Sequence, residues 1–124
     1  MDRVEKRKKA YRWGHYAEFI AALWLMAKGY QIVARRYGAR GGEIDLVIRR
    51  GSVVAFVEVK ARRDFDQALE AIDEIKSRRL GKAIEDWLWR HDPPVEQSFR
   101  GDAVIIVPWR LPRHIEDAFA LPLD

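Results

Sequence analysis

The chain has 124 residues, 48% of them hydrophobic and five of them tryptophan, which predicts one folded domain and excludes a disordered basic tail. It has no cysteine, so disulfides, thiolate metal sites and cysteine nucleophiles are excluded, as is typical of a reducing cytoplasm. Apolar stretches fall short of the roughly 20 residues that a membrane-spanning helix needs, and the charged N-terminus lacks a signal-peptide core. We therefore expect a cytoplasmic protein without membrane contact, with residues 1–124 forming a single domain.

The formal net charge is +4 and the pI is about 9.6, which favours a polyanionic partner. The basic residues gather in three places: residues 1–10, the segment with Arg35, Arg36 and Arg40, and the pair Arg62 and Arg63. Charge runs of this kind are usually a solvated surface. Here the second and third groups flank the carboxylates described below, and this proximity favours phosphate binding.

The first third of the chain predicts a helix, a strand and a loop. Residues 1–10 are expected to be a basic, flexible lead-in to a helix from Tyr11 to Lys28, which Gly29 ends. Apolar residues at i, i+3, i+4 and i+7 predict its buried stripe: Phe19, Ala22, Leu23 and Met26. Residues 30–36 are expected to form a short strand, followed by a glycine-rich loop over residues 37–42.

The next segment predicts a β-hairpin. Residues 43–50 and 53–61 are rich in β-branched residues, and Gly51-Ser52 between them fits a two-residue turn. In that register Asp45 lies opposite Glu58, and Glu43 lies opposite Lys60, all four on one face. The second strand is apolar up to Glu58, which predicts a central strand buried on both faces.

Two facing carboxylates destabilise an ordinary sheet, so a divalent cation between them is the simplest explanation. Asp45, Glu58 and a main-chain carbonyl such as that of Val59 would form a hard-oxygen site for Mg²⁺ or Mn²⁺. A bound cation activates water and shields phosphoryl charge, and Lys60 would orient or deprotonate that water. A structural salt bridge from Lys60 to Glu58 or Glu43 is the alternative, and the residues alone do not decide between the two.

The second half predicts one long helix, a strand and a last short helix. The long helix covers Ala68 to about Arg90, and Lys76 and Arg79 lie on its apolar arc. Their stems either cover apolar surface or aim their charges at phosphate on the sheet. Residues 97–107 are expected to form a strand in which Asp102 directly precedes the apolar core, Ala103 to Val107, and residues 114–120 are expected to form a helix. The expected order is α-β-β-β-α-β, with one mixed sheet between helices.

Rival chemistries lack their motifs. The chain has no G-x-S-x-G, no G-x-x-x-x-G-K-[ST] and no G-x-G-x-x-G. Its three histidines are scattered, so none is assigned a role. Trp24 and Trp87 lie at helical spacing, which favours core packing over stacking on bases.

Two motifs carry a family resemblance: GEIDL at residues 42–46 and FVEVKAR at residues 56–62. With Gly14-x-x-Ala17-Glu18 on the preceding helix, they resemble the PD-(D/E)xK nucleases of restriction-endonuclease-like fold. More narrowly, the chain from Gly14 to about Phe119 resembles the bacterial YraN-like family, which is similar in appearance to archaeal Holliday junction resolvases. The family tends to show Arg-Phe-Asp before the last strand, where this chain has Phe-Arg-Gly-Asp at residues 99–102.

The resemblance implies an α/β restriction-endonuclease-like fold and a Mg²⁺-dependent (or Mn²⁺-dependent) endonuclease acting on DNA rather than RNA, branched or otherwise structured. It implies Asp45 and Glu58 as metal ligands, Lys60 as the catalytic lysine and Glu18 as an additional acid directed at the metal. Paired cuts in a symmetric junction would favour a homodimer. We expect the phosphate contacts to come from the basic residues Arg36, Arg40, Arg62, Arg63, Lys76 and Arg79. The alternatives are a nucleic-acid-binding accessory protein with little or no catalysis, and a purely structural basic interaction module.

Overall fold

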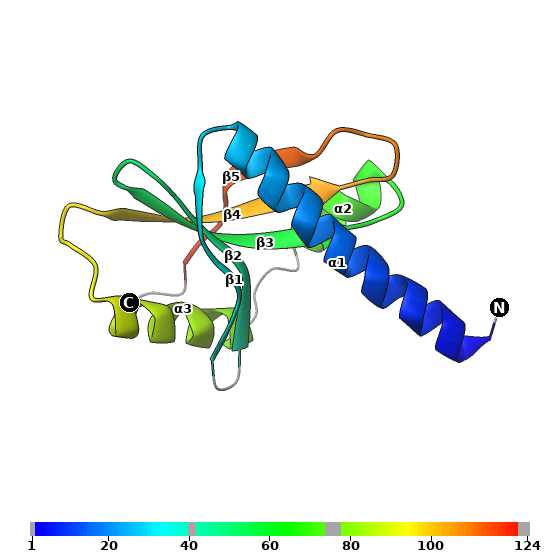
Figure 1. Ribbon diagram of the computed structural model, residues 1–124, viewed down its shortest axis with the longest axis horizontal. Helices are drawn as coiled ribbons and strands as arrows, with labels where there is room; N and C mark the ends of the chain where they lie inside the picture. The colour runs from blue at the N-terminus through cyan, green and yellow to red at the C-terminus, as the bar shows by residue number, and fades with distance from the viewer. Residues whose placement is uncertain (1, 40–41, 74–77, 122–124) are drawn as a thin grey trace.

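The computed structural model describes residues 2–39, 42–73 and 78–121 and contains one five-stranded sheet with helices on both faces (Figure 1). The strands lie in the sheet in chain order; β3 and β4 are parallel, and the other neighbours are antiparallel. The mixed sheet between helices is therefore as predicted, with β3 in the centre. The elements are α1 (Arg3–Ala27), β1 (Gln31–Ala39), β2 (Gly42–Arg50), β3 (Val53–Ala61), α2 (Phe65–Asp73), α3 (Arg78–His91), β4 (Ser98–Ile106) and β5 (Arg113–Phe119).

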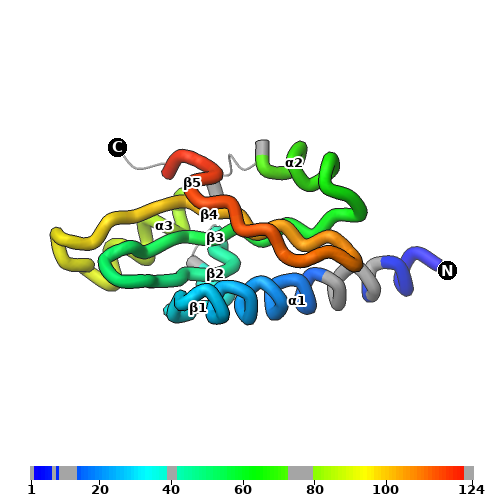
Figure 2. The backbone as a smooth tube through the Cα atoms, turned by 90° about the horizontal axis from the view of Figure 1, so that it is seen from above, coloured from blue at the N-terminus to red at the C-terminus, as the bar shows by residue number. Residues whose placement is uncertain are grey.

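Two apolar layers hold the helices on the sheet. On one face, α1 packs Ala17, Ala21 and Leu25 against residues of β2, β3 and β4. On the other face, α3 packs Ile84 and Trp87 against the remaining strand positions, and α2 adds a smaller contact. Figure 2 shows α1 along one side of the strands and α2 on the other. The core role predicted for Trp87 is confirmed, since the residue is buried against Phe56.

The predictions for α1 were partly wrong. The helix already begins at Arg3, where the Asp2 carboxylate accepts a hydrogen bond of 2.8 Å from the Glu5 amide, so residues 3–10 are helical and not a flexible lead-in. Its N-terminal part extends past the sheet (Figures 1 and 2). The buried side is an alanine stripe, while three residues of the predicted stripe are exposed: Phe19, Leu23 and Met26. Both arcs have helical periodicity, and the smaller side chains allow the closer approach to the sheet.

The predicted long helix over residues 68–90 is two separate helices, α2 and α3, on either side of residues 74–77. Gly81 does not divide them, since it lies buried within α3. The predicted Lys76 lies outside the described residues, and so does the side chain of Arg79. The division lets α2 cover the ends of β3 and β4, while α3 covers β1 and β2.

The last element is a strand, so the helix predicted for residues 114–120 is wrong. β5 pairs with β4 through Ala103–Ile115, Val104–His114 and Ile105–Arg113. The i, i+4 spacing of Ile115 and Phe119 imitates a helix because Asp117, at φ 53°, interrupts the alternation of the strand. Pairing with a buried edge thus overrides the local pattern.

Among the described residues, no helix is both long and apolar enough to cross a membrane.

Candidate active site

The predicted register of the hairpin is confirmed next to the turn, but the pairing of the two strands stops before it reaches Asp45 and Glu58. Arg50 pairs with Val53, and the ladder continues in step to Leu46 and Val57. The expected pairs of Asp45 with Glu58 and of Glu43 with Lys60 are not part of this ladder. Instead, Asp45 Oδ2 accepts a hydrogen bond of 2.8 Å from the Val59 amide, so a side chain takes the place of a main-chain partner.

The strand changes its face at Asp45, which explains why the ladder stops there. Leu46 and Ile48 pack in the α1 layer, whereas Ile44 packs in the α3 layer although it is two residues from Leu46. A regular strand would put all three on one face. In β1, the pairs on either side place Arg36 next to Asp45, and Arg36 has a φ of 50°. Both strands are therefore irregular at the same point.

Glu58 and Lys60 form an ion pair on β3, with 3.3 Å between Lys60 Nζ and Glu58 Oε1. Both belong to the row of side chains that Val54 and Phe56 direct toward the α3 layer. Their side chains remain 21% and 24% exposed. The salt bridge that the sequence left as an alternative is therefore present, and its atoms are still accessible to solvent and to a ligand.

The two carboxylates of the site are electrostatically strained. Burial, and then the charge of Glu58, raise the pKa of Asp45 to about 7, although the hydrogen bond from Val59 opposes the shift. Burial also raises the pKa of Glu58, against the effect of Lys60. The charges of Glu18 and Glu43 raise both pKa values further. Asp45 and Glu58 therefore both lie within Coulombic range of Glu18 and Glu43, and Glu43 was not among the predicted site residues.

Glu18 reaches this group from α1 and is already paired. Arg36 Nε donates to Glu18 Oε2 at 2.6 Å, and Arg36 Nη2 also contacts His15 Nδ1. Arg36 was predicted to bind phosphate, and here it holds the additional acid. The ion pair between Glu18 of α1 and Arg36 of β1 could not be predicted from the sequence, since the end of the helix and a turn separate the two residues.

The other predicted phosphate contacts are divided. Arg62 is half-buried and donates to the Ala61 carbonyl at 2.7 Å, whereas Arg63 is exposed. Arg40 lies outside the described residues. The structure thus brings the carboxylates and Lys60 together, and it leaves Arg63, three residues after Lys60, exposed to solvent.

The donor set fits a divalent cation in part. In residues 2–39, 42–73 and 78–121, no group of three or more histidine, cysteine, aspartate or glutamate side chains lies close enough to hold a metal ion. Asp45 and Glu58 supply two hard-oxygen ligands whose like charges a cation would neutralise. The remaining ligands would be the predicted Val59 carbonyl, water and phosphate oxygens, a set that suits Mg²⁺, which keeps several waters.

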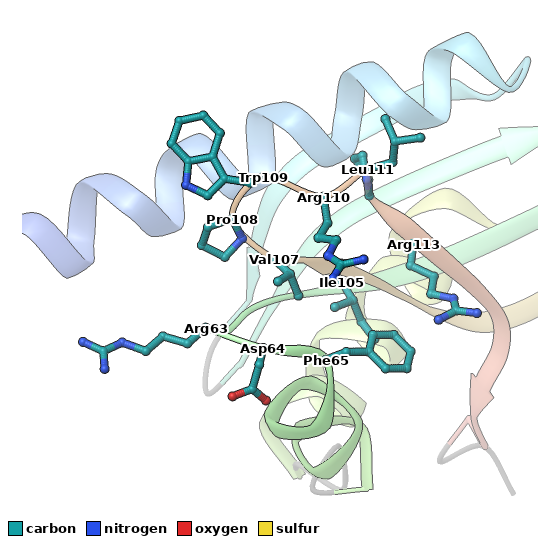
Figure 3. Close-up of a pocket in the computed structure, with 11 residues that line it drawn as sticks. Arg63, Asp64, Phe65, Ile105, Val107, Pro108, Trp109, Arg110, Leu111 and Arg113 are labelled. Carbon is teal, nitrogen blue, oxygen red and sulfur yellow. The ribbon is translucent and has the colours of Figure 1, made fainter.

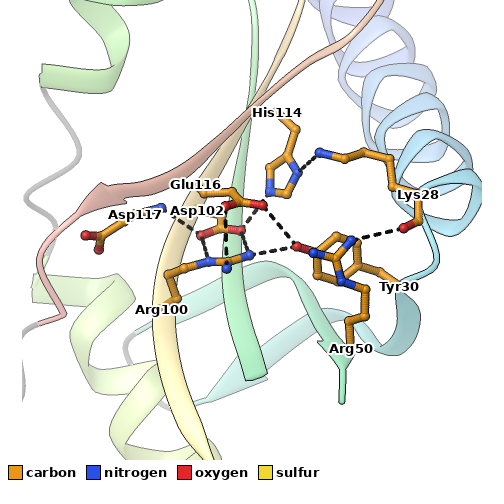
Figure 4. Close-up of polar contacts among 8 residues, drawn as sticks. All are labelled: Lys28, Tyr30, Arg50, Arg100, Asp102, His114, Glu116 and Asp117. Atoms are coloured by element: carbon orange, nitrogen blue, oxygen red, sulfur yellow. Dashed lines mark hydrogen bonds and ion pairs between the residues drawn. The ribbon is translucent and has the colours of Figure 1, made fainter. Parts of the chain in front are cut away.

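A second polar cluster, to which the sequence assigned no role, surrounds Asp102 (Figure 4). Asp102 is fully buried; Arg100 donates to both of its oxygens, at 2.7 and 2.9 Å, and the Asp117 amide donates at 3.0 Å. His114 Nε2 lies 2.7 Å from Oδ2, and Lys28 lies 2.6 Å from the other ring nitrogen. An aspartate next to the apolar run 103–106 was the available signal; Arg100 lies on the same strand, but His114 and Asp117 come from β5.

The chain belongs to the family described as "Uncharacterised protein family UPF0102", which matches residues 17–106. It is 52% identical over 113 residues to UPF0102 protein mlr4633 of Mesorhizobium japonicum, covering 91% of this chain and 90% of that protein. It is 51% identical over 118 residues to a UPF0102 protein of Methylobacterium nodulans, covering 95% and 92%. The predicted YraN-like family is thereby confirmed.

Proposed function

We propose that this chain is a metal-dependent nuclease that hydrolyses phosphodiester bonds of DNA, with a restriction-endonuclease-like fold of the PD-(D/E)xK superfamily. The observation that carries the proposal is the placement of Asp45, Glu58 and Lys60 where β2 leaves β3. Two half-buried carboxylates stand there beside an accessible ammonium group; in the described part of the chain, Asp45 accepts a hydrogen bond from the Val59 amide and Glu58 pairs with Lys60. Such an arrangement is costly in a sheet that only needs to fold.

Each side chain has a defined task in the proposed reaction. Asp45 and Glu58 would hold Mg²⁺ or Mn²⁺, which when bound lowers the pKa of water and neutralises charge on the phosphoryl group. Lys60 is held by Glu58 at 3.3 Å; as an ammonium it would orient the attacking water and stabilise negative charge on the pentavalent phosphorus. Glu18 would add a carboxylate from the α1 side, and Arg63 a phosphate contact from solvent.

The test is cleavage of labelled single-stranded, duplex, flap and four-way DNA with Mg²⁺, Mn²⁺ or EDTA. Metal-dependent cleavage is expected, and Asp45→Ala and Lys60→Ala should each reduce it by at least about 10³-fold. Glu85→Ala and Lys82→Ala are matched controls, because both residues are exposed on α3. Absence of cleavage on all four substrates with both metals would contradict the proposal.

A nucleic-acid-binding accessory protein is the second candidate. It is favoured by the pairing of Glu18 with Arg36 and by the lack of a three-ligand group in the described part of the chain. Titration calorimetry distinguishes the two functions. A binding protein would keep its DNA affinity in the Asp45→Ala, Glu58→Ala double variant and show no Mg²⁺ binding at this position.

A further inference from the structure

A pocket with a volume of about 830 Å³ lies beside the proposed active site, at the end of β4 (Figure 3). Its walls are the loop between β4 and β5, the start of β5 and the segment that leads from β3 into α2. Three arginines line it, Arg63, Arg110 and Arg113, together with the aromatic residues Phe65 and Trp109. Its size is in the range of ligand-binding pockets.

The sheet register joins this pocket to Lys60. Lys60 pairs with Ile105 of β4, which lines the pocket, and Ile105 pairs with Arg113 of β5. Residues paired across strands share a face, so the three side chains form one row on the α3 side of the sheet. Neighbouring strands are about 5 Å apart, which puts the Arg113 backbone about 10 Å from that of Lys60. A strand of DNA lying along this row would have its scissile phosphate at one end and the pocket at the other.

The two aromatic residues of the pocket differ in exposure: Trp109 is presented to solvent and not to the core, whereas Phe65 is half-buried. Trp109 is fully exposed, at 102% of its reference area, and its φ of 63° is a left-handed conformation that tryptophan rarely adopts. The guanidinium of Arg113 lies 4.5 Å from the centre of the Phe65 ring, so this arginine is positioned flat on an aromatic face.

The charge of the pocket is positive. Its one carboxylate, Asp64, accepts a hydrogen bond of 2.9 Å from the Gln67 amide and so caps the first turn of α2. The lining therefore holds three arginines and one acid, and that acid is engaged with a helix end. Arginines with flat aromatic faces are the chemistry that recognises unpaired nucleotides: phosphates bind the guanidinium groups and bases stack on the rings.

We propose that this pocket binds the unpaired nucleotides of a single-stranded DNA segment next to the phosphate that is cut. The inference rests on the proposed function for its purpose, because it names the substrate class of that same site. Duplex DNA does not expose its base faces, so the pocket would favour a substrate with a single-stranded arm over a continuous duplex.

Binding without cleavage tests the pocket separately from the chemistry. In EDTA, fluorescence anisotropy is measured with a labelled single strand of about 12 nucleotides and with a duplex of the same length. Trp109→Ala is expected to bind the single strand about tenfold more weakly, Trp109→Phe to stay near the parent, and the duplex affinity to change little. Trp89→Ala is the matched control, because Trp89 is 85% exposed on α3 and does not line the pocket.

The outcomes separate the two proposals. An unchanged single-strand affinity in Trp109→Ala, an equal loss for single strand and duplex, or equal competition by poly-glutamate of matched charge would overturn the pocket assignment even if cleavage is found. A Trp109-dependent preference for single strands, retained in Asp45→Ala, supports it. That preference without metal-dependent cleavage would keep the binding site and refute the nuclease function.

Discussion

Asp45 and Asp102 are two aspartates in one sheet with opposite surroundings. Asp102 is fully buried, yet Arg100, His114 and the Asp117 amide occupy both of its oxygens. Burial raises the pKa of Asp102, but these hydrogen bonds outweigh it, and the pKa lies below its ordinary value. Asp45, among the described residues, accepts one hydrogen bond, from Val59, and has like charges for neighbours, so its pKa is raised to about 7.

Asp102 is thus a carboxylate that the fold satisfies, whereas Asp45 is one that the fold leaves in an unfavourable environment. The chain itself supplies the hydrogen-bond partners of Asp102, from Arg100 on β4 and from His114 and Asp117 on β5, so that carboxylate stabilises the attachment of β5 to β4. Burial and the neighbouring carboxylates disfavour the charge of Asp45, and a cation bound as proposed would neutralise it. A site that binds a cation tightly is expected to be poorly satisfied without it, which is the usual conflict between stability and function.

The largest expected effect is on the satisfied cluster. Asp102→Ala should reduce the free energy of unfolding by about 3–5 kcal/mol, because it leaves the Arg100 guanidinium and His114 without their buried partner. Urea denaturation measures this change, with Asp66→Ala, an exposed residue of α2, as the control. A loss under about 1 kcal/mol, the size of a surface ion pair, would show that the cluster does not hold β5 in place.

An intermediate effect of opposite sign is expected at Asp45. Asp45→Asn should raise the free energy of unfolding by about 1–3 kcal/mol at pH 8 in EDTA, since it removes a charge that burial and Glu58 disfavour. Thermal denaturation with and without Mg²⁺ measures it. Mg²⁺ should stabilise the parent and leave the variant unchanged, whereas a destabilised variant would mean that the Asp45 charge is structurally required.

The pH dependence follows from the direction of each pKa shift. Between about pH 4 and pH 7, folded Asp45 keeps a proton that the unfolded chain releases, so its contribution to stability falls as pH rises. Asp102 acts in the opposite sense: its contribution is complete above the unfolded pKa and is lost as pH falls through the folded pKa. Asp45→Asn should therefore make the free energy of unfolding depend less on pH between pH 4 and pH 7. The loss of stability at acid pH, to which Asp102 contributes, should remain.

The smallest effect concerns the acid that α1 contributes. Glu18→Gln should weaken Mg²⁺ binding by about tenfold or less, because it removes a nearby negative charge without removing a predicted ligand. Arg36→Gln should strengthen Mg²⁺ binding, since the guanidinium that neutralises Glu18 is lost. Titration calorimetry at low ionic strength compares the two, and a change of the same sign in both variants would exclude this electrostatic role.

Much of the fold could be predicted where interactions are local. The turn at Gly51-Ser52 and the alternation beside it were sufficient for β2, β3 and their register up to Leu46 and Val57. The same local pattern failed for β5, whose helical spacing is overridden by its pairing with β4, and for the buried side of α1. Periodicity reports that a face is apolar, but it does not report which neighbour covers it.

The sequence by itself determined that Asp45, Glu58 and Lys60 lie near one another, because a two-residue turn connects their strands. Only the tertiary structure decided how they meet: β2 changes face at Asp45, so the carboxylate binds the Val59 amide and does not pair across the ladder with Glu58. It also brought Glu18, the Asp102 cluster and the pocket at Trp109 to their places, since their partners lie on elements far apart in the chain. Contacts between residues close in the chain follow from backbone geometry. The contacts of Glu18, Asp102 and the pocket depend instead on how the helices and strands are arranged around the sheet.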